Sequence, residues 1–245
     1  MVYGILCAMD EEFGILENEI AEKEVTEIYS RRFISGKING QRVVAAVSRI
    51  GKVAAAFTTA VLIEKFKVDA LVFCGIAGGL GDNVKIGDIV IGTGCVQHDF
   101  YLSDSDFFRI PLLNISNIPC DKALSEKCLN AAAEFCKGEK TKEITEFFAS
   151  VNVKEPKVHT GIIASGDQFI SSDQKRLWLK ENIENVMCCE MEGAAVAQAA
   201  FEAGVPCAII RVISDSADGD AEVSFDKFVS AASLYSSAII KNLFK

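Results

Sequence analysis

Short apolar runs alternate with helical patterns from one end of the chain to the other, and this alternation restricts the fold more than any other feature. Each apolar run is short enough for one buried strand. Strands are expected at residues 2–8, 33–38, 41–47, 70–74, 86–96, 159–164, 186–189 and 207–213. Helices are expected at residues 10–24, 51–66, 121–137, 173–182, 191–203 and 224–243. Strands joined by helical crossovers predict an α/β fold whose mostly parallel central sheet is flanked by helices.

The segment 33–47 adds an antiparallel pair to this sheet. Asn39 and Gly40 separate two apolar runs, and this dipeptide is typical of a type I′ hairpin turn. The sheet is therefore expected to be mixed. Residues 99–117 form a long irregular stretch, and such loops in compact domains usually carry function. No repeat or linker interrupts the pattern, so a single domain is expected over residues 1–245.

Composition excludes several classes of protein. The formal net charge of -9 disfavours a nucleic-acid partner, because phosphate neutralisation requires clustered Lys and Arg. The nine cysteines are odd in number and lack regular spacing, so free thiols in a reducing compartment are expected. No apolar run approaches the roughly 18 residues of a membrane span, and the N-terminal apolar stretch is too short for a signal peptide. We therefore expect a cytoplasmic protein that does not bind membranes.

The scarcity of histidine limits the possible chemistry. Only His98 and His159 occur, so HExxH zinc sites and His-rich metal clusters are excluded and no bound metal is expected. A lone histidine such as His98 is most often a surface or capping residue. The glycine-rich residues 75–81 follow an expected strand but do not match G-x-G-x-x-G. This mismatch disfavours a dinucleotide, and no cofactor is expected.

Acidic residues directly follow three of the expected strands. They lie at residues 10–12, at Glu190 and Glu192, and at Asp215 and Asp218. In an open parallel sheet the carboxyl ends of the strands border one ligand cleft. Helix capping is sufficient to explain Asp10 and Glu11. Three acidic strand ends in one cleft favour acid–base catalysis instead, since neighbouring carboxylates raise each other's pKa. Cleavage of a glycosidic bond needs such a set.

At these residues the chain resembles the methylthioadenosine/S-adenosylhomocysteine nucleosidases, within the wider nucleoside phosphorylase family. The matching segments are 8–12 (AMDEE), 48–55 (SRIGKVAA), 75–80 (GIAGGL), 85–90 (KIGDIV), 161–170 (GIIASGDQFI), 190–192 (EME), 211–215 (RVISD) and 224–226 (SFD). They follow the family's order and spacing across nearly the whole chain. The resemblance implies a nucleoside phosphorylase-like fold and hydrolysis of the N-glycosidic bond of an adenine nucleoside.

The resemblance also implies the catalytic roles. Glu12 falls where the family places the base that activates the attacking water. Asp215 falls on the acid that protonates the imidazole-ring nitrogen of the purine. Ser214 and Ser216 flank this acid, and either hydroxyl is expected to orient it. Phosphorolytic relatives carry a glycine-arginine phosphate loop near the N-terminus, whereas residues 10–12 are acidic here, which favours water over phosphate.

Further residues match positions that bind the substrate. Glu192 matches the carboxylate that holds the ribose hydroxyls, and Met191 packs against the sugar. Phe169 is expected to stack on the base while the backbone of Ile170 contacts its amino edge. The other expected contacts to the nucleoside are Met9, Ile50, Ala77, Gly78, Ser214 and Phe225.

Three departures from the family pattern concern specificity. Ile76 stands where the family usually has serine, Arg49 replaces a small residue, and residues 100–108 replace the usual Asp-x-Thr-x-Phe-Gly pattern. In the family that last segment crosses a dimer interface, so a homodimer is implied. Adenosine, a futalosine-type nucleoside and phosphorolysis of a purine nucleoside remain alternatives, as does a nucleoside-binding protein without catalysis. Retention of Glu12, Glu192 and Asp215 favours an enzyme.

Overall fold

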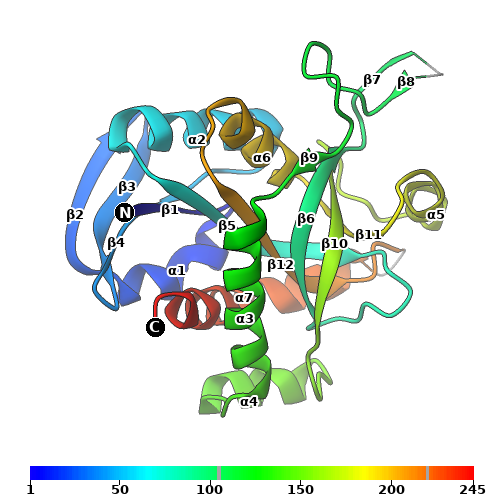
Figure 1. Ribbon diagram of the computed structural model, residues 1–245. Helices are drawn as coiled ribbons and strands as arrows, with labels where there is room; N and C mark the ends of the chain where they lie inside the picture. Colours follow the sequence, from blue (N-terminus) through cyan, green and yellow to red (C-terminus); the bar gives the residue numbers. More distant parts are fainter. Residues whose placement is uncertain (104–105, 219–220) are drawn as a thin grey trace.

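The computed structural model describes residues 1–103, 106–218 and 221–245, and of residues 106, 222–224, 226–227 and 230–231 only the backbone. A mixed sheet runs through the molecule and helices cover both of its faces (Figure 1). Its strand order is β11 (Val186–Glu190), β10 (Val158–Ser165), β6 (Ile89–Gln97), β12 (Cys207–Asp215), β5 (Ala70–Gly79), β1 (Val2–Cys7), β4 (Gln41–Val47), β3 (Arg31–Ile38) and β2 (Ala21–Ile28). This arrangement confirms the predicted α/β fold with a mixed sheet.

Parallel pairing dominates the centre of the sheet. Strand β5 lies between β1 and β12 and is parallel to both, while β10 is parallel to β6 and β11. The central strands are buried on both faces, and nearly all residues of β5 and β12 are inaccessible to solvent. Burial on both faces requires nearly continuous apolar sequence, which explains why these strands were visible as uninterrupted apolar runs.

The sheet closes on itself at one end. The last residues of β5 pair antiparallel with β11, so that Gly78 lies opposite Cys189 and Gly79 opposite Cys188. Strands β11, β10, β6, β12 and β5 thus form a closed ring. Closure draws the carboxyl ends of β5, β11 and β12 together.

Two helical layers pack on the sheet (Figure 1). One layer contains α1 (Asp10–Glu19), α3 (Lys122–Lys137), α4 (Lys142–Ser150) and the C-terminal α7 (Ala221–Leu243). The other contains α2 (Lys52–Phe66) and α6 (Gly193–Glu202). Helix α5 (Asp173–Asn182) packs beside β10 and β11, with Leu179 in a third apolar cluster. Each layer buries the apolar face of its helices against the sheet, which is the main favourable term in folding.

The predicted hairpin is confirmed, because β3 and β4 are antiparallel and Asn39 and Gly40 both have positive φ, 48° and 81°. The helix predicted over residues 10–24 was too long. Helix α1 ends at Glu19, and the following residues form the largely exposed edge strand β2 against β3. The sequence of β2 has no alternation of apolar and polar residues, since both of its faces are solvated, and so it gave no strand signal.

Two other expectations were wrong. The strand expected over residues 70–74 was too short, because β5 continues through the glycine-rich residues to Gly79, where it meets β11. His98 is not a surface residue: its side chain is fully buried, and neither ring nitrogen has a partner among the described residues. Helix α4 was not predicted.

The long irregular stretch contains little regular structure. It holds the short pair β7 (Tyr101–Ser103) and β8 (Asp106–Phe107), which stands out from the body in Figure 1, and ends at β9 (Ile118–Pro119). Residues 104 and 105, within the segment that departs from the family pattern, lie outside the described residues. No helix in the described parts of the chain is long and apolar enough to cross a bilayer.

Candidate active site

A cavity of about 390 Å³ opens where the carboxyl ends of β1, β5, β11 and β12 meet. Its volume lies within the range of about 300–1,000 Å³ that is usual for small-molecule sites. All twelve residues expected to form the site line this cavity: Met9, Glu12, Ile50, Ala77, Gly78, Phe169, Ile170, Met191, Glu192, Ser214, Asp215 and Phe225. Sequence reasoning did not assign five other lining residues: Ala8, Ile76, Gln168, Cys189 and Glu190.

Glu12 lies in the first turn of α1, and its carboxylate faces back toward β1 and β5. Oε2 accepts hydrogen bonds from the backbone N–H groups of Ala8 (2.7 Å) and Met9 (3.0 Å), and Oε1 accepts one from Ile76 (3.0 Å). The side chain is 2% exposed. Burial raises its pKa above the usual 4.5, while nearby Arg211 and the three N–H donors oppose the rise. Glu12 therefore caps its helix and is also held rigidly as a base of increased strength.

Asp215, at the end of β12, is anchored by its own chain. Ser214 Oγ donates to Oδ2 at 2.7 Å, and the Ala217 backbone N–H donates to Oδ1 at 2.8 Å. Ser216, the other flanking serine, is exposed. Burial raises the pKa of Asp215, and the two hydrogen bonds oppose that rise. A buried carboxyl group with a raised pKa is suited to donate a proton.

Glu192 connects α6 to the start of α2. Its Oε1 accepts a hydrogen bond from the Gly51 N–H at 2.8 Å, although the two residues are 141 positions apart. Burial first, and then the adjacent charge of Glu190, raise the pKa of Glu192 to about 8. The Gly51 contact and Arg211 act in the opposite direction. This carboxyl group lies in the cavity at 6% exposure, where it can exchange hydrogen bonds with a polar ligand.

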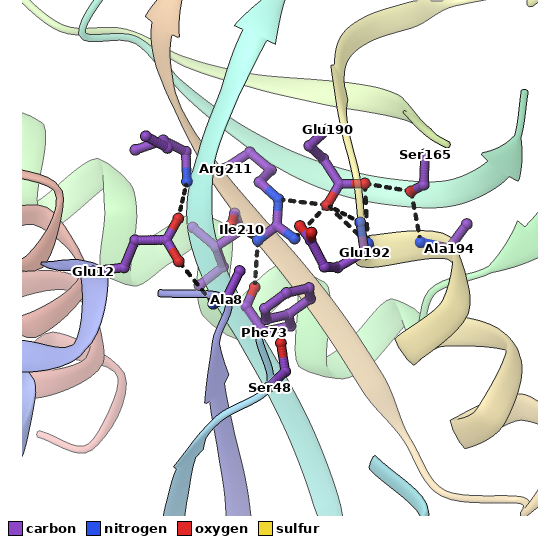
Figure 2. Close-up of polar contacts among 12 residues, drawn as sticks. Ala8, Glu12, Ser48, Phe73, Ser165, Glu190, Glu192, Ala194, Ile210 and Arg211 are labelled. Atoms are coloured by element: carbon purple, nitrogen blue, oxygen red, sulfur yellow. Dashed lines mark hydrogen bonds and ion pairs between the residues drawn. The ribbon is translucent and has the colours of Figure 1, made fainter. Parts of the chain in front are cut away.

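A buried ion pair of Arg211 and Glu190 lies near the carboxyl groups of Glu12 and Glu192 (Figure 2). Arg211 Nη2 lies 2.6 Å from Glu190 Oε2, and Nη1 of the same side chain donates to the Ile210 carbonyl. The Glu190 carboxylate also accepts from the Ser165 hydroxyl and from the backbone N–H groups of Glu192 and Gly193. The pair therefore fixes the turn that presents Glu192. An arginine within the apolar run of residues 207–213 was the signal in the sequence, because a buried charge needs a partner.

Two glycines of β5 lie directly against the two carboxylates proposed as base and acid. A Cβ atom built on Gly75 would be 2.7 Å from Glu12 Oε1, and one built on Gly78 would be 2.8 Å from Asp215 Oδ1. Neither distance is possible without displacement of the carboxylate. The absence of a side chain at these positions is therefore what allows both acids to approach the same strand.

The rest of the cavity wall is mainly apolar. The rings of Phe169 and Phe225 meet edge to face, with centroids 5.5 Å apart. Phe169 is 42% exposed and Ile50 57% exposed, so the wall formed by these residues reaches the protein surface. Such a surface can accept the flat face of an aromatic ligand.

The departures from the family pattern have clear locations. Ile76 lines the cavity and donates its backbone N–H to Glu12, and its side chain supplies no hydroxyl. The Ser214 hydroxyl is the one that contacts Asp215. The guanidinium of Arg49 donates to the Ser30 carbonyl at 2.6 Å, and Arg49 is not among the residues that line the cavity.

The described residues contain no group of three or more His, Cys, Asp and Glu side chains that could hold a metal ion. The chemistry that the cavity can supply from its own residues is proton transfer. Two separately anchored carboxyl groups, each with a raised pKa, can act as a general acid and a general base on one bound molecule.

Comparison with known proteins places this arrangement in a family. Residues 2–245 match the model of the phosphorylase superfamily. The 5′-methylthioadenosine/S-adenosylhomocysteine nucleosidase of Exiguobacterium sp. is 35% identical over 240 residues, which cover 98% of this chain and 96% of that protein.

Comparison with solved structures indicates the same family. The nucleosidase of that name from Neisseria meningitidis, in complex with methylthio-immucillin-A, has a TM-score of 0.87 and 31% identity, covering 99% of this chain and 97% of the other. The futalosine hydrolase of Helicobacter pylori has a TM-score of 0.83 and 30% identity, with coverage of 99% and 97%. The chain thus belongs to the phosphorylase superfamily and, within it, to the family of methylthioadenosine/S-adenosylhomocysteine nucleosidases.

Proposed function

We propose that this chain is a purine nucleosidase that hydrolyses the N-glycosidic bond of 5′-methylthioadenosine and S-adenosylhomocysteine, releasing adenine and the thioribose sugar. The observation that carries the proposal is the pair of buried carboxyl groups, Glu12 and Asp215, which line one cavity and are anchored independently of each other. The family to which the chain belongs supplies the substrate class.

The reaction uses the two groups in sequence. Asp215 donates its proton to the imidazole-ring nitrogen of the purine, so the bond between the base and the sugar breaks with neutral adenine as leaving group. Glu12 takes a proton from a water molecule as that water attacks the anomeric carbon. Each proton transfer contributes on the order of 10²–10⁴ in rate. The raised pKa values of both groups suit these roles, because efficient acids and bases have pKa values near the working pH.

Binding of the nucleoside is assigned to the remaining wall of the cavity. Glu192 accepts hydrogen bonds from the ribose hydroxyls, and Met191 packs against the sugar. Phe169 stacks on the base, with the backbone of Ile170 at its amino edge. Ala77 and Gly78 lie beside the base and the water, and Ser214 orients Asp215. Met9, Ile50 and Phe225 form the apolar wall of the pocket, and no cofactor takes part.

Water rather than phosphate is the proposed nucleophile. The described lining residues include four acids and neither Lys nor Arg. The nearby guanidinium of Arg211 is occupied by Glu190 and by backbone carbonyl groups. A phosphate dianion would meet like charge without a free cation to offset it.

Further properties belong to the same proposal. Residues 1–245 act as one domain, and two copies form a homodimer through the apolar surface beside the cavity, where Ile50, Val53 and Phe57 are exposed. The nine free cysteines suit a reducing cytoplasm. Removal of thionucleosides there would serve methionine salvage.

A nucleoside panel tests the proposal. Purified protein is incubated with methylthioadenosine, S-adenosylhomocysteine, adenosine and futalosine, with and without phosphate, and the products are separated. We expect adenine and free thioribose from the first two at a rate independent of phosphate. A sugar-1-phosphate product would show a phosphorylase instead. Futalosine is the second candidate substrate because of the similarity to the Helicobacter pylori enzyme. Preference for futalosine would change the proposed substrate but not the proposed reaction.

A further inference from the structure

Three residues from distant parts of the chain form a closed cycle of polar contacts near the cavity. Lys52 is the first residue of α2, while Asp99 and Asp167 follow the ends of β6 and β10. Lys52 Nζ donates to Asp99 Oδ1 at 2.5 Å, and the Asp167 N–H donates to Asp99 Oδ2 at 2.8 Å. The Lys52 N–H donates to Asp167 Oδ1 at 2.8 Å and closes the cycle. We call these three residues the clamp.

The ion pair of the clamp, Lys52 and Asp99, is shielded from solvent, whereas Asp167 is exposed. The side chains of Lys52 and Asp99 are 14% and 18% exposed. Burial by itself would raise the pKa of Asp99, but the hydrogen bonds from Lys52 and the Asp167 N–H lower it below its usual value. Asp99 is therefore held in its ionised form, and bonds to an ionised acceptor are stronger than those between neutral groups.

The neighbours of the clamp in sequence line the cavity or contact a residue that lines it. Gly51 precedes Lys52 and donates its N–H to Glu192, which is assigned to the ribose. Phe169 lies two residues beyond Asp167 and is assigned to the base. None of the three clamp residues is among the described residues that line the cavity. The clamp therefore connects the base end and the ribose end of the cavity without contributing a lining residue.

Gly51 shows how closely these segments approach. Its φ of 96° is in the region that favours glycine, and a Cβ atom there would be 3.3 Å from Asp167 Oδ1. The start of α2 thus packs directly on the segment that leads to Phe169. A change in the clamp would move both segments relative to each other.

We propose that Asp99 is a positioning residue for nucleoside binding: by holding Lys52 and Asp167 together, it fixes Phe169 at the base end of the cavity relative to Glu192 at the ribose end. The inference rests on the proposed function for the assignment of those two ends. It separates binding from chemistry, because Glu12 and Asp215 are anchored by Ala8, Met9, Ile76, Ser214 and Ala217, outside the clamp.

The main test is Asp99→Asn, which keeps the size of the side chain and removes its charge. KM for methylthioadenosine should rise about tenfold, as expected for the loss of charge-assisted hydrogen bonds, while kcat stays within about threefold. Asp82→Asn is the matched control, because Asp82 also lies 2.5 Å from a lysine, Lys180, but on the surface and away from the cavity. This control should leave both constants unchanged. Lys52→Gln should raise KM in the same direction and serves if the first variant does not fold.

A double variant tests whether Asp99 acts through Phe169. Phe169→Ala removes the group to be positioned, so adding Asp99→Asn to it should raise KM by less than Asp99→Asn does alone. An equal rise in both backgrounds would overturn the proposal. So would an unchanged KM in Asp99→Asn, or a fall in kcat alone.

Hydrogen exchange in the ligand-free protein separates this inference from the proposed function. Asp99→Asn should speed exchange of the amide hydrogens of Lys52 and Asp167 together, whatever the enzyme's substrate is, and Asp82→Asn should not. If the parent protein does not release adenine, the proposed function fails. The proposed role of Asp99 is still supported in that case if Asp99→Asn speeds exchange at both amides and weakens adenine binding. Exchange unchanged at both amides would overturn it.

Discussion

Arg211 and Glu190 form an ion pair inside the protein, with Nη2 of the arginine 2.6 Å from Oε2 of the glutamate and side-chain exposures of only 1% and 3%. Each charge has further partners, since the guanidinium also lies over the ring of Phe73. A buried charge with satisfied hydrogen bonds is tolerated, but it becomes costly when its partner is removed. The same ion pair therefore affects both the stability of the sheet and the geometry of the site.

Replacement of one partner should destabilise the fold. Glu190→Gln leaves the Arg211 charge without its direct counter-ion, and we expect the free energy of unfolding to fall by about 3–5 kcal/mol. Urea denaturation followed by circular dichroism measures this loss. The surface pair of Lys180 and Asp82 serves as control, and Asp82→Asn should unfold at the parental urea concentration. Parental stability of Glu190→Gln would mean that the other nearby carboxylates balance Arg211 by themselves.

Glu192 should make stability depend on pH. Its pKa is about 8 in the folded protein, raised by burial and by Glu190, against 4.5 for an ordinary glutamate. Between these values the folded state retains a proton that the unfolded state has lost. The free energy of unfolding should therefore decrease as pH rises from about 4.5 to about 8 and level off above that. The comparison is with Glu192→Gln, which lacks this slope; parallel pH profiles of the two proteins would contradict the assignment.

The two glycines of β5 should be intolerant of even a methyl group. Gly75→Ala places a Cβ atom 2.7 Å from Glu12 Oε1 and 3.1 Å from Arg211 Nη1, and Gly78→Ala places one 2.8 Å from Asp215 Oδ1. Each variant must shift a carboxylate proposed to be catalytic, and a displacement of this kind reduces rate by about 100-fold. Gly14→Ala, which meets nothing within 4 Å in helix α1, should keep full activity. Full activity of Gly75→Ala would exclude Glu12 as the positioned base.

Asp215→Asn should separate binding from bond cleavage. Asparagine preserves the size of the side chain but cannot give a proton to the purine, so adenine release should fall by about 10²–10⁴. Affinity for a non-hydrolysable nucleoside analogue, measured by calorimetry, should remain close to parental. A nitrophenyl riboside, whose leaving group departs without protonation, should lose much less rate. Turnover of methylthioadenosine at the parental rate would place the acid elsewhere.

The buried strands and the cavity could be predicted because their signals are local. Apolar runs marked the central strands, and acids at the ends of β1, β11 and β12 pointed to one edge of the sheet. Family resemblance then selected twelve residues that all line the cavity. The edge strand β2 escaped prediction because both of its faces are solvated, so its sequence carries no hydrophobic period.

Other features depend on contacts between distant parts of the chain. The sequence shows that Arg211 needs a counter-ion but does not say which carboxylate supplies it. The clamp joins residues 47 and 68 positions apart, and closure of the ring at Gly78 and Gly79 depends on pairing with β11. A single sequence does not reveal such pairings, because the two segments meet only in the folded structure. For the same reason His98, read as a surface histidine, is buried.

The position of β12 within the ring governs the order in which the molecule can assemble. Strand β12 (Cys207–Asp215) lies between β5 and β6, which precede it in the chain by more than a hundred residues. Until the ribosome has delivered this strand, β5 and β6 each present an unpaired apolar edge, and exposed edges of this kind invite aggregation. Pairing between strands so far apart in sequence also slows folding, because the long loop between them loses conformational entropy before the new contacts can stabilise the sheet. The strand that carries Asp215 is therefore the one whose late arrival completes the sheet.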